Sequence, residues 1–566
     1  MKLFTVSGNA YWYNYKSNKI EEYAGQRESV LPSVHYLDVP EFKCLSELEH
    51  FIIEITRDCN LRCSYCCYSG QYARHRVHER RSMNNDMIDD VITFINTVRN
   101  CNKQLTISLY GGEPLMFPDI VRYTINKCKG SFPANTTYTI STNGVLLNEV
   151  FLSFCVENSI ILNISIDGIP SLHDKNRRDK AGYPTFGIVH QHLESILYKY
   201  PNYWENNVRL FVTIESLSQL KDIAFYWGKD EVLKRKEPTA VSTIAPNYDS
   251  KSYHAIKPVG NECDSMIELL DYYEKNRDNR FCEGFFERFI SDVFNRPVFD
   301  IPAAIYPLVC LPNNYRCFID VNGNIGICEK VCDELRFGNI YTGIDMNEVN
   351  SIVSEHASIK KKRCENCWAF RLCRTCYTNY GYSERAWKED CDNSRASVKL
   401  QLLVMLEMAE RKMLLEEGTK NIQLRELIPD DIDSIKGILT KRNVIKEMKY
   451  LSFCQTMEGA SLLYETLTGG GYSDGEDAIM RGITIGKSKL VGIVGVDSIE
   501  DGKGNLFFFL DDDYWGRGIM TCAMSMFLTK HFRKGIGVYA RISKNNSRAL
   551  KLVSKFSVIT VMIEDI

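Results

Sequence analysis

Apolar runs rich in β-branched residues alternate with amphipathic stretches from residue 48 onward. The apolar runs are typical of strands buried on both faces, and stretches such as Met87–Val98 between them have helical periodicity. This alternation predicts a parallel sheet, rolled into a barrel or partial barrel. The expected strands are Phe51–Thr56, Leu105–Tyr110, Thr137–Ser141, Ile161–Ile166, Val208–Ile214 and Ala240–Ala245.

The remaining pattern divides the chain into further segments. Residues 1–47 predict a small β-rich element with strands around a polar turn at 16–18, and residues 256–304 predict a helical bridge after a barrel at 48–255. A long helix is expected over 395–417, and it marks a linker at 396–421 between a cysteine-rich domain at 305–395 and an α/β domain at 422–566. The last domain ends soon after Phe556, which suggests truncation.

Composition narrows the class of protein. The 566 residues are 44% hydrophobic and 25% charged, so the chain is folded, and no apolar run is long enough for a membrane helix. The formal net charge of −3 argues against nucleic acid as a partner. The chain start lacks the pattern of a secretory signal, which predicts a cytoplasmic, reducing location. There, the 21 cysteines point to metal or redox chemistry.

Three cysteines follow the first predicted barrel strand with C-x3-C-x2-C spacing: Cys59, Cys63 and Cys66. Three thiolates on one loop can hold three irons of a [4Fe–4S] cluster and leave the fourth iron open for a reaction. The alternative is a zinc loop that takes its fourth ligand from elsewhere. Cys67 has no metal role in either interpretation.

Short polar motifs follow the next predicted strands, at the end of the sheet where barrel enzymes place their chemistry: Gly111-Gly112-Glu113-Pro114, Thr142-Asn143-Gly144 and Asp167-Gly168. Together with the cysteine loop they resemble the radical S-adenosylmethionine (radical SAM) superfamily over residues 48–250. The resemblance implies a partial (β/α)6 TIM-like barrel and a cluster on Cys59, Cys63 and Cys66. It also implies that S-adenosylmethionine is bound by Tyr65, Gly111, Gly112, Glu113, Ser165 and Arg177.

A second cysteine series carries enough thiols for two four-cysteine sites, and the alternation of residues 318–328 around Asn322-Gly323 predicts that at least one of them is built on a β-hairpin. Paired C-x2-C spacings are normal for zinc, but behind a radical SAM barrel the series resembles a SPASM domain, which carries two auxiliary [4Fe–4S] clusters. The resemblance assigns the first cluster to Cys310, Cys317, Cys328 and Cys376, and the second to Cys364, Cys367, Cys373 and Cys391. The spacing Cys373-x2-Cys376 departs from the family's three residues, which leaves the partition of ligands open. Cys332 is unassigned.

The resemblance implies a 5′-deoxyadenosyl radical that removes a hydrogen from a ribosomally made peptide, with a small electron donor such as flavodoxin or ferredoxin. We expect a cysteine thioether crosslink, because Cys328-Glu329-Lys330-Val331 looks like the peptide maturases. Sulfatase maturases carry an aspartate base after this cysteine, so formylglycine formation with Glu329 as the base is the alternative. A zinc-structured binding protein with a vestigial barrel is an alternative of another class. The N-terminal strands are interpreted as the remnant of a peptide-recognition element.

The C-terminal segment has a glycine-containing turn that opens a helix, which is typical of pyrophosphate binding. With Asn545–Phe556 and Leu424–Asp431 it resembles a GNAT-type N-acetyltransferase. The family's loop would bind acetyl-coenzyme A through the backbone of Gly516, Arg517, Gly518 and Met520. The family's glutamine or arginine at the start of this loop is Trp515 here. Both an active transferase and a degenerate docking domain are therefore open.

Overall fold

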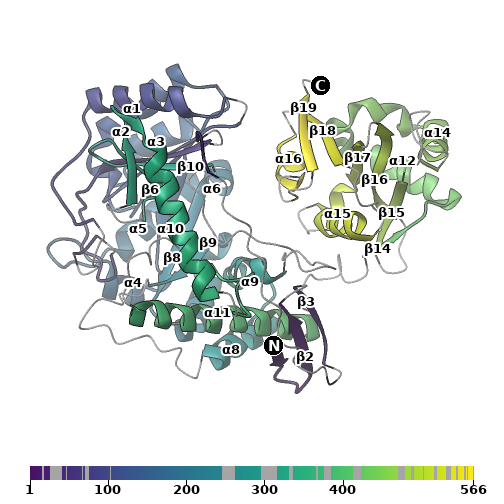
Figure 1. Ribbon diagram of the computed structural model, residues 1–566, viewed down its shortest axis with the longest axis horizontal. Coiled ribbons are helices and arrows are strands. Elements are labelled where there is room, and N and C mark those ends of the chain that lie inside the picture. The colour runs from purple at the N-terminus through teal and green to yellow at the C-terminus, as the bar shows by residue number, and fades with distance from the viewer. Residues whose placement is uncertain are drawn as a thin grey trace. The chain divides into compact units, whose positions relative to one another are not determined.

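The computed structural model divides the chain into two compact units, Met1–Glu407 and Met408–Ile566, each of which is described by itself (Figure 1). It describes the whole sequence except residues 16–17, 24, 26–40, 46–47, 67, 71–75, 102, 245–261, 295–314, 331–334, 365–366, 375–383, 412, 414–421, 469–478, 486–489, 501–502, 516–518, 531–536, 544–545, 554–555, 557–558 and 565–566.

The first unit is built on a ten-stranded sheet with the order β13-β12-β11-β10-β4-β5-β6-β7-β8-β9. The six strands from β4 to β9 pair in parallel with one another, which confirms the predicted alternation of strands and helices. These strands are β4 (His50–Thr56), β5 (Thr106–Gly111), β6 (Thr137–Thr142), β7 (Ile161–Ser165), β8 (Val208–Ile214) and β9 (Pro238–Thr243). The helices between them are α1 (Asn85–Val98), α2 (Pro118–Ser131), α3 (Glu149–Glu157), α4 (Pro170–Asn176), α5 (Phe186–Lys199), α6 (Pro201–Asn207) and α7 (Leu220–Lys229).

Burial on both faces explains the strand signal. In β4 every residue after His50 is buried, and the run from Phe51 to Ile55 is apolar apart from Glu54. The helices instead bury one stripe: α1 buries Ile88, Val91, Ile92, Phe94 and Ile95 against the sheet. Its first turn is fixed by the Asn84 side chain, which accepts a hydrogen bond from the Met87 N–H at 2.9 Å.

The cysteine-rich segment continues the barrel sheet instead of forming a separate layer. Strand β10 (Arg316–Ile319) pairs in parallel with β4, and it forms an antiparallel hairpin with β11 (Asn324–Gly326) through the turn predicted at Asn322-Gly323. Strands β12 (Arg336–Asn339) and β13 (Gly343–Ile344) extend the hairpin. The helices of this segment and of the bridge before it are α8 (Glu262–Lys275), α9 (Arg280–Phe294), α10 (Met346–Cys364) and α11 (Glu384–Glu410).

Helix α11 differs from the prediction. It begins at Glu384, eleven residues before the expected start, so Cys391 and most of the expected linker lie on one continuous helix. The first residues, Glu384–Asn393, are mostly polar and give little apolar periodicity, which explains the late start expected from the sequence.

The N-terminal strands form a three-stranded antiparallel sheet of β1 (Lys2–Phe4), β2 (Ala10–Asn14) and β3 (Lys19–Glu22). One face packs on the loop that follows α10. The Tyr13 ring meets Trp368 edge-on at 6.4 Å, and the Arg371 Nε–H donates to the Tyr15 carbonyl at 2.8 Å. This small sheet therefore belongs to the cysteine-rich segment in space although it lies at the other end of the unit's sequence.

The second unit is a six-stranded sheet with the order β14-β15-β16-β17-β18-β19 and a buried apolar cluster on each face. Its strands are β14 (Ile422–Arg425), β15 (Ile479–Ile485), β16 (Leu490–Glu500), β17 (Lys503–Leu510), β18 (Gly537–Ser543) and β19 (Ile559–Glu564). Its helices are α12 (Ile432–Leu439), α13 (Arg442–Glu447), α14 (Met457–Thr468), α15 (Ile519–Lys530) and α16 (Ser547–Val553). In the described part of the whole chain, no helix combines the length and apolar character needed to cross a bilayer.

Candidate active site

Cys59, Cys63 and Cys66 lie on the loop that leaves the carboxyl end of β4. Cys59 is buried and the other two are half-buried. The three thiols are close enough for the charges of Cys63 and Cys66 to act on Cys59. Burial and the neighbouring Glu113 carboxylate raise the pKa of Cys59 to about 12. The Leu61 N–H donates to the Cys59 sulfur at 3.4 Å, as backbone amides do to cluster thiolates. This donor set fits a [4Fe–4S] cluster held by three thiolates.

The two glycines after β5 allow this loop to pack closely. A Cβ atom on Gly112 would lie 2.1 Å from the Asp58 carbonyl oxygen, and one on Gly111, whose φ is +146°, would lie 2.2 Å from that of Thr56. The Gly112 and Glu113 N–H groups donate to these same carbonyls at 2.8 and 2.9 Å. Only glycine permits this approach of two backbones, so the pair fixes the start of the cysteine loop against β5.

Glu113 is fully buried and links β5 to the end of β6. Its carboxylate accepts hydrogen bonds from the Thr142 hydroxyl at 2.8 Å and the Asn143 N–H at 2.6 Å, and from the Leu115 N–H at 3.0 Å. Burial nevertheless raises its pKa to about 7. The expected role of Glu113 toward the methionine amino group stays a prediction, and the structure adds that this carboxylate is held by the Thr142-Asn143-Gly144 motif.

Asn143 braces the cysteine loop directly. Its side-chain amide donates to the Asn60 side chain at 2.8 Å and lies 3.8 Å from the Cys59 sulfur. The sequence placed the Thr142-Asn143-Gly144 motif at the catalytic end of the sheet but assigned no role to Asn143 itself.

Asp167 joins two predicted ligands of S-adenosylmethionine. Its carboxylate accepts hydrogen bonds from the Tyr65 hydroxyl and from Arg177 Nε, the latter at 2.8 Å, and the Arg177 guanidinium lies 5.5 Å from the centre of the Tyr65 ring. Burial raises the pKa of Tyr65 well above its ordinary value, so the phenol stays a proton donor. Sequence reasoning noted Asp167 only as part of a turn motif and missed this role.

Two polar groups at this end of the sheet are available to form hydrogen bonds with a ligand. The terminal nitrogens of the buried Arg177 guanidinium make no hydrogen bond with any described residue, and neither does the half-buried Ser165 hydroxyl at the end of β7. A guanidinium fork and a hydroxyl are suited to a carboxylate ligand. Arg177 and Ser165 therefore suit the role predicted for them.

The four thiols predicted for the second auxiliary cluster come together. Cys364 ends α10, Cys367 and Cys373 lie on the following loop, and Cys391 lies on α11. The Cys364 thiol is close to each of the other three, and Arg395 lies within hydrogen-bonding reach of Cys367. Four converging thiols fit a four-cysteine metal site.

The thiols predicted for the first auxiliary cluster are described only in part. Cys317 is fully buried on β10, where Arg336 lies close to its thiol. Cys328 follows β11 and lies close to Arg316. Cys310 and Cys376, like the unassigned Cys67 and Cys332, lie outside the described residues.

Glu329 is held by the segment that follows the cysteine loop. Its backbone carbonyl accepts hydrogen bonds from the Tyr68 hydroxyl at 3.3 Å and from the Arg76 guanidinium. Arg76 is buried and also pairs with Glu54 of β4 at 2.8 Å. One carboxylate oxygen of Glu329 is buried without a hydrogen-bond partner. Tyr68 and Arg76 are functional candidates that sequence reasoning missed, because no motif marks them.

Comparison with known proteins agrees with this geometry. The radical SAM superfamily matches residues 53–185. The serine-type anaerobic sulfatase-maturating enzyme of Bacteroides thetaiotaomicron is 30% identical over 297 residues, which are 50% of this chain and 70% of the relative. The cysteine-type enzyme of Clostridium novyi is 25% identical over 345 residues, 58% of this chain and 88% of the relative. The chain belongs to the radical SAM superfamily.

The enzyme is a radical SAM/SPASM maturase related to the sulfatase-maturating enzymes. Its radical SAM barrel implies that it binds a [4Fe–4S] cluster and S-adenosylmethionine. A solved structure, native anSMEcpe with bound AdoMet, is 19% identical, covers 62% of this chain and 99% of its own, and has a TM-score of 0.46. The acetyltransferase (GNAT) domain family matches residues 421–557, so the maturase carries a C-terminal acetyltransferase domain.

The sheet of the acetyltransferase domain opens at the carboxyl ends of two strands. Strands β17 and β18 pair only from Lys503 to Asn505, and beyond these residues their partnered positions end although both strands continue. Of the predicted coenzyme loop, Met520 lies in the first turn of α15 with its side chain in the core, while Gly516, Arg517 and Gly518 lie outside the described residues.

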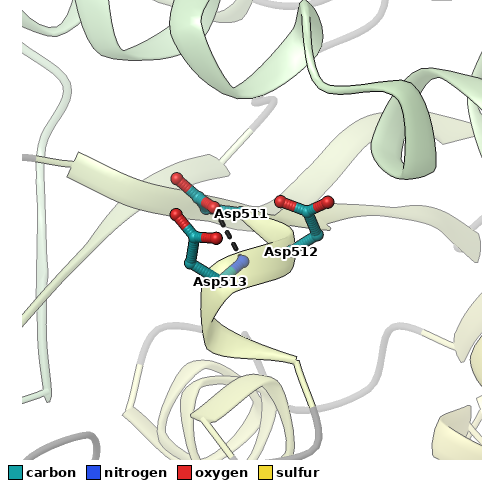
Figure 2. Close-up of side chains that lie close together, drawn as sticks. All are labelled: Asp511, Asp512 and Asp513. Carbon is teal, nitrogen blue, oxygen red and sulfur yellow. Dashed lines mark hydrogen bonds between the residues drawn. The ribbon is translucent and has the colours of Figure 1, made fainter.

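An acidic triad precedes this loop: Asp511, Asp512 and Asp513 (Figure 2). The Lys441 ammonium lies within 3.3 Å of a carboxylate oxygen of each of the three. The Lys441 charge offsets much of their mutual repulsion, and the triad thereby ties the end of β17 to the turn before α13. It is explained as a structural ion network.

Proposed function

We propose that this maturase removes a hydrogen atom from a cysteine-containing peptide and joins the cysteine sulfur to a carbon of another residue as a thioether. The thioether is favoured by the run Cys328-Glu329-Lys330-Val331, which looks like the peptide maturases. The observation that supports a base in either reaction is the Glu329 carboxylate, which has a buried, unpartnered oxygen and is anchored through its backbone to Tyr68 and Arg76. A base at this junction can take the thiol proton while the substrate carbon is activated nearby.

In this proposal two groups of barrel residues bind the catalytic cluster and S-adenosylmethionine. Cys59, Cys63 and Cys66 hold the catalytic cluster, and Tyr65, Gly111, Gly112, Glu113, Ser165 and Arg177 hold S-adenosylmethionine. When bound, cluster and cofactor supply a 5′-deoxyadenosyl radical. Asp167 orients Tyr65 and Arg177. The terminal nitrogens of the buried Arg177 guanidinium, which make no hydrogen bond with a described residue, support its role as a clamp for the methionine carboxylate.

Formation of a thioether bond requires that a hydrogen atom, a proton and an electron each have an acceptor. One hydrogen atom leaves the substrate carbon, the thiol proton passes to Glu329, and one electron must leave the product for an acceptor. The cysteines predicted for two auxiliary clusters are the groups of this chain suited to hold such an acceptor. Convergence of Cys364, Cys367, Cys373 and Cys391 supports the second of these sites.

Formylglycine formation is the second candidate, because the relatives named above are sulfatase-maturating enzymes. There the same base would serve a cysteine or serine of a sulfatase. Mass spectrometry of the reacted peptide separates the candidates. A thioether removes two hydrogens and keeps the sulfur but abolishes the free thiol, whereas formylglycine from cysteine replaces sulfur by oxygen.

The decisive experiment uses the iron-loaded enzyme with S-adenosylmethionine, a chemical reductant and cysteine-containing peptides encoded beside its gene. We expect 5′-deoxyadenosine release and a peptide lighter by two hydrogens, and both should vanish when Cys59, Cys63 and Cys66 are replaced by alanine. Glu329→Gln should keep 5′-deoxyadenosine release but lose the peptide product. Release of 5′-deoxyadenosine by the triple alanine variant would refute the catalytic assignment.

We also propose that the C-terminal unit binds acetyl-coenzyme A and acetylates the peptide or its carrier. The opening between β17 and β18 supports this, because unpaired strand edges offer backbone groups to an extended ligand. The proposed contacts are the backbone N–H groups of Gly516, Arg517, Gly518 and Met520 at the start of α15. Thermal denaturation with and without coenzyme A tests this binding, since a ligand of the folded state raises the midpoint.

A further inference from the structure

Exposed arginines flank the cysteine loop on both sides. Arg62 lies on the loop, Arg80 and Arg81 lie on the segment before α1, and Arg178 follows α4. No carboxylate of the described residues forms an ion pair with any of these four. Of the acidic groups nearby, Asp58 pairs with Lys180 at 2.9 Å and Glu79 pairs with Arg57 at 3.6 Å. Asp179, next to Arg178, accepts hydrogen bonds from the Ala181 and Tyr183 N–H groups at 2.9 and 2.8 Å. The outward side of the loop therefore carries a net positive charge.

The flanking segments are joined directly to the loop. The Arg62 N–H donates to the Arg178 carbonyl at 2.7 Å, and on the other side the Arg57 N–H donates to the Arg81 carbonyl at 2.9 Å. The His78 imidazole lies 3.7 Å from the Cys66 sulfur. The four arginines thus lie on one structural unit with the three cysteines.

A cavity of about 450 Å³ opens on this side, and its wall includes Arg62, Cys63, Tyr68, Val77 and His78. Cys63 brings one predicted cluster ligand to the cavity wall. Val77 is 54% exposed and adds an apolar side chain to the cavity wall that also includes Arg62. A small apolar centre with a charged rim is typical of weak, transient protein interfaces, including those of electron-transfer partners.

We propose that this face, formed by Arg62, Val77, Arg80, Arg81 and Arg178, docks a small acidic electron-transfer protein with a flavin or iron–sulfur centre. The proposal rests on the proposed function, which needs a reduced cluster. Cys59, Cys63 and Cys66 would hold the cluster that accepts one electron from the reduced centre of the donor, and the donor would be oxidised by one electron with no transfer of atoms. Opposite charges steer such encounters, and salt weakens them.

The test compares two charge-reversal variants of the iron-loaded, full-length enzyme. The first, Arg80→Glu with Arg178→Glu, changes one arginine on each flank of the loop. The control, Lys129→Glu with Lys229→Glu, makes the same change in net charge at the ends of α2 and α7, which lie at the opposite end of the sheet because these helices run against the strands. Both control lysines are exposed.

Release of 5′-deoxyadenosine is measured with dithionite and, separately, with a reduced acidic flavodoxin as the probe, at low and high salt. With dithionite all three proteins should react at the same rate. With flavodoxin the docking variant should be slower by about tenfold or more at low salt, and its rate should respond less to salt than that of the wild type.

Equal flavodoxin rates in the docking variant and the control would overturn the assignment of this face. A loss with dithionite as well would also overturn it, because the face would then act on the chemistry itself. Absence of 5′-deoxyadenosine from the wild type with dithionite would instead refute the proposed function, and with it any role of a donor at this loop.

Discussion

Arg177 donates its Nε–H to the Asp167 carboxylate at 2.8 Å and leaves its terminal nitrogens without a partner among the described residues. Asp167 thereby fixes the orientation of a guanidinium whose terminal nitrogens pair with no carboxylate in the part of the chain that the structure describes. The Arg177 guanidinium also lies over the ring of Tyr65, one residue before the third cysteine of the loop, and the Tyr65 hydroxyl donates to Asp167. A ligand carboxylate that enters here meets a preoriented donor.

Arg177→Lys should weaken binding of S-adenosylmethionine by roughly tenfold, on the order of 1.4 kcal/mol, because an ammonium cannot replace two parallel N–H donors. Equilibrium dialysis under anaerobic conditions measures this. Arg122→Lys, a change on α2 away from the site, should leave the affinity unchanged. Equal affinity in both variants and the wild type would remove Arg177 from the binding site.

Gly112→Ala should displace the cysteine loop, because the new Cβ would lie 2.1 Å from the Asp58 carbonyl oxygen. We expect a loss of roughly four irons per chain, the content of one [4Fe–4S] cluster, with the others retained. Iron and sulfide analysis of the reconstituted protein measures this. Gly130→Ala is the matched control, since nothing lies within 4 Å of its Cβ position. Full iron content in Gly112→Ala would contradict the role given to this close approach.

Glu113 makes the stability of the fold depend on pH. Its folded-state pKa of about 7 lies above the ordinary 4.5 because of burial, so its stabilising contribution is complete below pH 4.5 and is lost as the pH rises through 7. The change corresponds to about 3 kcal/mol. Glu113→Gln should flatten this part of the pH profile of unfolding free energy, measured by denaturant titration at pH 5 and pH 8.

Glu149→Gln provides the comparison for that profile. Its ion pair with Lys199 lowers the pKa of an exposed carboxylate, so it titrates below pH 4.5 and should leave the slope between pH 5 and pH 8 unaltered. If the slope of Glu113→Gln matches that of Glu149→Gln, the raised pKa of Glu113 is wrong.

Cys364→Ala should remove the second auxiliary site without touching the radical-generating loop. We expect roughly four irons fewer per chain and unchanged release of 5′-deoxyadenosine, with loss of the modified peptide. Cys101→Ala, at an exposed thiol far along the sequence from either series, should keep full iron content. Unaltered iron in Cys364→Ala would show that these four thiols hold no cluster.

The barrel strands were predictable because each carries buried apolar residues in a short run: β4 is buried on both faces, whereas β7 buries every second residue. The pairing of β10 with β4 could not be predicted. Some 260 residues separate partners such as Phe318 and Ile52, and no local sequence pattern indicates this contact. The Asn322-Gly323 turn, by contrast, is a local signal, and its hairpin is confirmed.

The functional site shows the same contrast between local and long-range signals. The short spacing of Cys364, Cys367 and Cys373 is a local pattern that predicts a metal site, and in the structure these thiols lie near Cys391. Asp167 reads as a turn residue because its partners, Tyr65 and Arg177, come from different elements. Its role depends on tertiary contacts that only the folded chain reveals.

The place of β10 in the sheet has a practical consequence for work on the isolated barrel. Strand β4 is an interior strand, covered by β5 on one side and β10 on the other. A fragment that ends before residue 315 would leave the β4 edge as a long apolar row of unpaired backbone groups, which is the kind of edge that drives aggregation. The cysteine-rich segment thus also protects the β4 edge of the radical-generating barrel from aggregation, and the two should be produced together.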